Sequence, residues 1–104
     1  MLVEVLTFDG CPHGGAALAL AQRVAAEAPC ATEVRLLNVE MEQTRALRFL
    51  GSPSIRVNGH DVEPGADSRH SYSFGCRLHA TEDGLQPLPS EQWLRDALQM
   101  AHPG

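Results

Sequence analysis

Along the first part of the chain, the spacing of hydrophobic residues alternates between one typical of strands and one typical of helices. Residues 2–8, "LVEVLTF", are mostly branched or aromatic and end at an Asp-Gly turn, which predicts a central strand. Residues 14–28 place alanine, leucine and valine at helical spacing with a polar side opposite, and predict an amphipathic helix that Pro29 ends. Residues 33–39, "EVRLLNV", return to a strand pattern. A strand, a helix and a strand joined by short connections predict a right-handed parallel unit.

The next part of the chain changes from a helical pattern to a hairpin pattern. Residues 40–50 carry apolar side chains on one helical face before a terminating glycine, and predict a second helix. Residues 54–57 and 60–62 then flank an Asn-Gly pair, which is the strongest short signal for a β-hairpin. We expect these two strands to be antiparallel.

The last part begins with a polar, turn-rich stretch at residues 63–73. Residues 74–80, "FGCRLHA", predict a short strand. Ser90 follows a proline and precedes an acid, which is a helix-start signature, and the apolar stripe after it predicts a C-terminal helix. No repeat or long linker divides the chain, so residues 1–104 are expected to form one α/β domain.

The composition narrows the classes of function. Eight basic residues, all arginines, stand against 13 acids and give a net charge of −5 at pH 7, so neither nucleic acid nor a membrane is an expected partner. The first residues include Glu4 and no basic leader, so we expect no signal peptide. Three cysteines in a chain that can fold without disulfides favour the cytoplasm. No phosphate-binding loop or dinucleotide fingerprint appears, and no cofactor is expected.

Cys11, in the stretch "FDGCPHGG", is the side chain that the sequence predicts to be most reactive. It lies where the first strand meets the first helix, and the free N–H groups and dipole of a helix start favour thiolate over thiol. Pro12 suits the first helical turn because its missing N–H breaks no hydrogen bond. His13 can add a positive charge or a donor beside the sulfur. Cys11 is therefore a candidate nucleophile toward a disulfide, a peroxide or another electrophile.

The other cysteines leave alternatives open. Cys76 follows a polar loop long enough to cross the site, which makes it a candidate resolving thiol, although it can also be a small buried hydrophobe. Cys30, after the first helix, is expected at the far end of the strand–helix–strand unit, with a structural or incidental role. A different combination, Cys11, His13, Cys76 and His79, would be a soft-metal site for a thiophilic ion.

Three charged residues near these thiols are expected to have ordinary roles. Asp9 precedes a glycine and is predicted to form the turn, with a second role as a proton acceptor left open. Arg56 and Arg77 are expected to be solvated at strand edges rather than to bind an anion or a thiolate.

The order of elements, with a cysteine at the first strand–helix junction and a proline before the hairpin, resembles the thioredoxin-like fold over most of the chain. More narrowly, "FDGCP" and residues 50–67, "LGSPSIRVNGHDVEPGAD", are similar to small bacterial thioredoxin-like proteins often labelled alkylmercury lyase-related. True alkylmercury lyases use two cysteines and an aspartate in a differently organised domain, and that set does not map onto this chain. We therefore do not expect alkylmercury lyase activity.

The resemblance implies roles for residues around the reactive cysteine. In thioredoxin-like proteins the proline before the hairpin is usually cis and faces the active-site cysteine, which assigns that role to Pro53. Ser52 and Ser54, with Pro53 and Pro12, would then form a surface whose backbone groups bind an extended peptide or a small thiol. Cys-Pro-His also resembles the active-site start of strongly oxidising disulfide oxidoreductases. Gly14 departs from that pattern, because those proteins carry the resolving cysteine there.

Two classes of function follow from these features. The first is thiol–disulfide exchange, or reduction of an oxidised or electrophilic substrate, at Cys11, with a small thiol or a protein disulfide as partner. The second is a non-catalytic module that binds a thiophilic metal or a protein partner. Repeated turnover of a disulfide in the presence of small thiols is expected only for the first.

Overall fold

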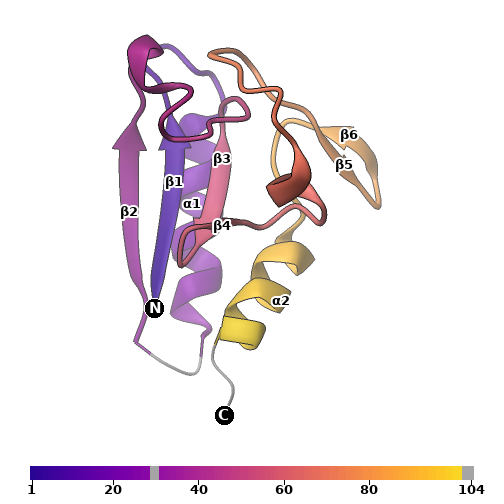
Figure 1. Ribbon diagram of the computed structural model, residues 1–104. Helices are drawn as coiled ribbons and strands as arrows, with labels where there is room; N and C mark the ends of the chain where they lie inside the picture. The colour runs from indigo at the N-terminus through magenta and orange to yellow at the C-terminus, as the bar shows by residue number, and fades with distance from the viewer. Residues whose placement is uncertain (29–30, 102–104) are drawn as a thin grey trace.

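A four-stranded sheet forms the centre of the protein, for which the computed structural model describes residues 1–28 and 31–101 (Figure 1). The strands are β1 (Leu2–Thr7), β2 (Glu33–Asn38), β3 (Ser54–Val57) and β4 (His60–Asp61), in the order β2-β1-β3-β4. Strand β2 is parallel to β1, while β3 is antiparallel to both β1 and β4. The mixed α/β class predicted from the sequence is confirmed.

Two helices, α1 (Gly14–Ala26) and α2 (Glu91–Ala101), bury the main core against one face of this sheet. The Ser90 hydroxyl accepts a hydrogen bond from the Gln92 N–H at 3.2 Å, as expected of a residue that caps α2. Pro29, predicted to end the first helix, lies outside the described residues. Among the residues that the structure describes, no helix is long and apolar enough to cross a membrane. The main core contains Val3, Val5, Ala17, Leu20, Ala21, Val24, Ile55, Val57, Val62, Leu94 and Leu98.

The predicted helix at residues 40–50 is wrong. Only a short 3₁₀ helix, η1 (Met41–Gln43), forms there, followed by turns. Phe49 is fully buried in a second, smaller core with Leu6 and Val39, and Arg48 takes a left-handed conformation with a φ of 53°. The Arg56 guanidinium donates hydrogen bonds to the carbonyl oxygens of residues 47 and 48, at 2.6 and 3.0 Å, which a continuing helix would use itself. Tertiary contacts therefore replace the local helical pattern.

The predicted strand at residues 74–80 is only partly present. Strand β5 (His79–Thr81) begins near its end and pairs with β6 (Gly84–Gln86) in a separate two-stranded hairpin, while Cys76 forms an isolated bridge with Ser52. Figure 1 shows this hairpin apart from the main sheet. The Asp83-Gly84 pair, whose glycine begins β6, was an available hairpin signal. A second 3₁₀ helix, η2 (Ala66–Ser68), interrupts the polar loop before it.

Candidate functional site

A tight turn carries the chain from β1 to Cys11. The Cys11 N–H donates to the Phe8 carbonyl at 3.1 Å, and Gly10, with a φ of 88°, takes the left-handed position that this turn needs. His13 is the residue that caps α1, and the first helical residue is Gly14. Pro12 therefore precedes the helix cap and does not lie in the first helical turn, contrary to the prediction.

Four hydrogen-bond donors surround the Cys11 sulfur. They are the hydroxyls of Ser52 and Thr7 and the backbone N–H groups of His13 and Gly14. Partial burial raises the pKa of Cys11, but the hydrogen bonds from Ser52, His13, Thr7 and Gly14 outweigh burial and leave that pKa below its ordinary value. The thiolate is thus favoured by donors from three separate segments of the chain.

Thr7 and Ser52 form a buried hydroxyl pair, with 2.8 Å between their oxygens. Each hydroxyl has one proton to donate, so two protons serve three contacts: one between the hydroxyls and one from each to the sulfur. When Cys11 is a thiolate, both protons can turn toward the sulfur. When it is a thiol, one of them can return to the other hydroxyl. The pair can therefore follow the charge of Cys11 without any backbone movement.

Thr7 also fills the space beside Gly14, the position where a resolving cysteine next to Cys11 would stand. A Cβ atom on Gly14 would lie 2.7 Å from the Thr7 Oγ1, well inside normal contact distance. A cysteine at position 14 is therefore incompatible with Thr7 in this arrangement. No sequence pattern marks Thr7, because its role depends on a contact across the strand–helix junction.

The side chains of the other candidate residues beside Cys11 are not among the groups that bond to its sulfur. His13 acts on the sulfur through its backbone N–H, and its imidazole makes no hydrogen bond or ion pair to another described residue. Asp9 and Pro12 are exposed in the turn. These positions agree with a turn role for Asp9.

The cis-proline turn lies beside this site. The Ser52–Pro53 peptide bond is cis, and Ser52, Pro53 and Ser54 are all buried. The Ser54 hydroxyl donates to the Gly51 carbonyl at 2.6 Å. Ser52 is thus the member of this turn that connects directly to Cys11, through its side chain.

The segment around Cys76 pairs with the backbone of Ser52. The Ser52 N–H donates to the Gly75 carbonyl at 2.8 Å, and the Arg77 N–H donates to the Ser52 carbonyl at 2.9 Å. The expectation that Ser52 offers free backbone groups to a substrate is therefore wrong, because the chain itself occupies both. The exposed Cys76 is the residue that this pairing places opposite Ser52.

Cys76 is joined to the Cys11 site through Ser52. The Ser52 backbone bridges Cys76, while the Ser52 hydroxyl contacts the Cys11 sulfur. Arg77, the next residue, packs against the same turn, since its Cβ lies 2.9 Å from the position that a Gly51 Cβ would take. Cys76 therefore belongs to the segment that borders the Cys11 site.

The alternative metal site at Cys11, His13, Cys76 and His79 is not assembled. His79 is fully buried, and its ring nitrogens lie 3.1 Å from the Glu63 carboxylate and 3.0 Å from the Pro53 carbonyl. In the described part of the chain, no three histidine, cysteine or acidic side chains are placed to hold a metal ion together. His79 is used as a structural hydrogen-bonding residue. Cys30 lies outside the described residues.

The ionic surroundings of His79 predict how stability depends on pH. Burial and the nearby Arg77 charge lower the pKa of His79, although the Pro53 carbonyl and Glu63 oppose them. The unfolded chain therefore binds this proton more tightly, and the free energy of unfolding should fall as pH decreases below the ordinary value of 6.5. Urea unfolding between pH 7 and 5 should show this fall, and His79→Gln should reduce it. The exposed His60, as His60→Gln, is the control, and an unchanged slope in His79→Gln would contradict the assignment.

Arg77 is the second residue whose role the sequence did not predict. Its side chain is 1% exposed and forms ion pairs with Asp61 and Glu63, so the expectation of a solvated arginine is wrong. Arg56 is also not solvated as expected, since it bonds to two backbone carbonyls. No local pattern marks either arginine, because their partners come from other segments.

Comparison with known proteins places the chain among its relatives. A thioredoxin from Methanocaldococcus jannaschii is 38% identical over 63 residues, which are 59% of this chain and 73% of the archaeal protein. No family model and no solved structure match the chain. The match covers most of the relative's length, at an identity that indicates common descent. The chain belongs to the thioredoxin family.

Proposed function

We propose that the protein carries out thiol–disulfide exchange, with Cys11 as the attacking thiolate and Cys76 as the resolving thiol. The observation that carries the proposal is the set of four donors on the Cys11 sulfur, beside a bridge that pairs Cys76 with Ser52. A lowered thiol pKa raises the fraction of the reactive thiolate near neutral pH. Membership of the thioredoxin family supports the same chemistry.

The reaction proceeds in two exchanges. The Cys11 thiolate attacks one sulfur of a substrate disulfide, forms a mixed disulfide and releases the other substrate sulfur as a thiolate, which takes up a proton. The Cys76 thiolate then attacks the Cys11 sulfur, forms the Cys11–Cys76 disulfide and releases the second substrate thiolate. The substrate gains two electrons, and the two cysteines lose them. A low-molecular-weight thiol or a dithiol then reduces the protein disulfide in the same way.

The occupied backbone of Ser52 favours small disulfides over extended peptides as substrates. A peptide that pairs with Ser52 would have to displace the hydrogen bonds to Gly75 and Arg77. A small disulfide needs only access to the partly exposed Cys11 sulfur. Protein disulfides on exposed, flexible segments remain compatible with the same approach.

A non-reducing peptide map tests the proposal. After mild oxidation of the reduced protein, the dominant link should be Cys11–Cys76, and Cys30→Ser should leave that link unchanged. Cys76→Ser should accumulate a mixed disulfide between Cys11 and glutathione when oxidised glutathione is supplied. Cys11→Ser should prevent both products. If Cys76→Ser turns over disulfides as fast as the wild type, Cys76 has no resolving role.

We propose that residues 1–104 form one thioredoxin-like domain that works in the cytoplasm, where low-molecular-weight thiols can reduce it. The Cys-Pro-His-Gly sequence and residues 50–67 support a place among the small bacterial proteins labelled alkylmercury lyase-related, without their namesake activity.

A further inference from the structure

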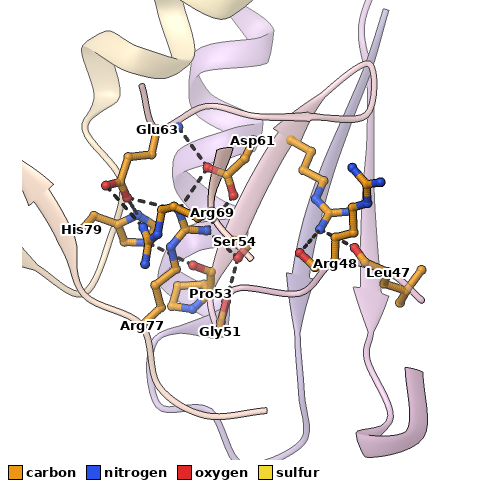
Figure 2. A network of polar contacts seen from close by, with 11 residues as sticks. Leu47, Arg48, Gly51, Pro53, Ser54, Asp61, Glu63, Arg69, Arg77 and His79 are labelled. Carbon is orange, nitrogen blue, oxygen red and sulfur yellow. Dashed lines mark hydrogen bonds and ion pairs between the residues drawn. The ribbon is translucent and has the colours of Figure 1, made fainter. Parts of the chain in front are cut away.

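A buried ionic cluster surrounds the side chain of Arg77 (Figure 2). One guanidinium nitrogen, Nη1, donates to the Ser54 hydroxyl at 2.8 Å and to the Asp61 carboxylate at 2.6 Å. The other, Nη2, donates to Asp61 and to Glu63, both at 3.1 Å. Four hydrogen bonds to three residues therefore hold a guanidinium that is almost inaccessible to water.

This arrangement fixes Arg77 to the sheet and not merely to its own loop. Asp61 belongs to β4 and Ser54 begins β3, and the Ser54 hydroxyl is itself bonded to the Gly51 carbonyl. Two carboxylates neutralise the buried charge, and paired contacts between arginine and a carboxylate define direction as well as distance. The hydrogen bonds of the Arg77 side chain thus hold the Arg77 backbone against the cis-proline turn.

The rest of the Cys76 segment is held against the same turn. Phe74 packs against Phe8, with ring centroids 4.7 Å apart and a tilt of 35° between the rings, and the Gly75 carbonyl accepts a hydrogen bond from the Ser52 N–H. Gly51 permits the close approach, since a Cβ there would lie 2.9 Å from the Arg77 Cβ and 3.0 Å from the Gly75 oxygen. Cys76 therefore lies between two anchored neighbours, and its own side chain is an exposed, free thiol.

We infer that Arg77 is a positioning residue that holds Cys76 beside Cys11, so that the second exchange occurs within the protein. This inference rests on the proposed function. Immobilising the segment raises the effective concentration of the Cys76 thiol toward a mixed disulfide on Cys11. Arg77 itself makes no contact with the reacting sulfurs, and it acts only through the position of its neighbour.

The quantity that tests this inference is the equilibrium between two products in a glutathione redox buffer. One product is the Cys11–Cys76 disulfide, and the other is the mixed disulfide of Cys11 with glutathione; mass spectrometry without reduction counts both. Arg77→Met should lower the ratio of the first to the second by about tenfold or more. Arg77→Lys keeps the charge but loses the paired contacts, and should recover part of the ratio. Arg69→Met is the matched control, because Arg69 contacts Glu63 but does not border Cys76.

A second measurement separates positioning from general damage to the fold. In a Cys76→Ser background, Arg77→Met should leave the rate of Cys11 alkylation unchanged, because Arg77 contributes nothing to the Cys11 sulfur. If Arg77→Met does not fold, Glu63→Gln serves instead and should lower the ratio by a smaller factor. A folded Arg77→Met protein with the wild-type ratio would overturn the positioning role alone. A wild-type protein that never forms the Cys11–Cys76 disulfide would overturn the proposed resolving step, and the inference with it.

Discussion

The double variant Thr7→Val/Ser52→Ala is expected to raise the pKa of Cys11 and to suppress its thiolate near neutral pH. Both hydroxyls donate to the Cys11 sulfur in the folded protein and lower its pKa. A hydrogen bond to a charged group contributes about 1.5–3 kcal/mol, and about 1.4 kcal/mol corresponds to a factor of ten. At a pH below the pKa, loss of one such bond corresponds to a roughly tenfold to hundredfold lower thiolate fraction, and loss of the pair should lower that fraction by at least as much. Each single variant should give a smaller reduction.

The measurement is a titration of the thiolate by its ultraviolet absorbance, in a Cys30→Ser/Cys76→Ser background where only Cys11 titrates. A direct titration is preferable to an alkylation rate, because a higher pKa also makes the remaining thiolate more nucleophilic. Ser54→Ala is the matched control, since Ser54 is a buried hydroxyl of the same turn that bonds to Gly51 and Arg77. Superimposable curves for the double variant and the background would leave the helix N–H groups as the only stabilisers of the thiolate.

Gly14→Ala is expected to destabilise the protein, although alanine normally improves a helix. The new Cβ would lie 2.7 Å from the Thr7 Oγ1 and 3.4 Å from the Thr7 Cβ, and the branched threonine has little freedom to withdraw. Overpacking of this kind costs about 1–3 kcal/mol. Gly15→Ala is the control in the same helix, because nothing lies within 4 Å of its Cβ position. That variant should be neutral or gain up to about 1 kcal/mol.

A double-mutant cycle isolates the contact. Thr7→Ala removes the Oγ1, so Gly14→Ala should cost much less in that background, and urea unfolding of the four proteins gives the coupling free energy. Additive losses would show that Thr7 is not the obstacle. The result also bears on chemistry: a neighbouring dithiol should form in Thr7→Ala/Gly14→Cys more readily than in Gly14→Cys, because only the former has room for the second thiol.

Local sequence patterns were sufficient to predict the elements that depend on residues close in sequence or that bury a single face. The apolar run of β1, the alanine-rich period of α1, the Asn-Gly hairpin and the Ser90 cap all identified real elements, with ends within a few residues. Cys11 was also identifiable, because a cysteine at a strand–helix junction meets unpaired N–H groups wherever the rest of the chain goes. Each of these inferences depends only on residues that are close to one another in the sequence.

Tertiary structure decided the features that join distant segments. Residues 40–50 have a helical pattern, yet burial of Phe49 and capture of two carbonyls by Arg56 outweigh the small free energy of one short helix. Thr7 and Ser52 are 45 residues apart, and only the pairing of β1 with β3, just after Ser52, brings both hydroxyls to one sulfur. Arg77 appears solvated in sequence but is buried, because Asp61 and Glu63 neutralise its charge. The sequence by itself determined that Cys11 lies at a strand–helix junction, and long-range packing decided which hydroxyls contact its sulfur and that Cys76 bridges Ser52.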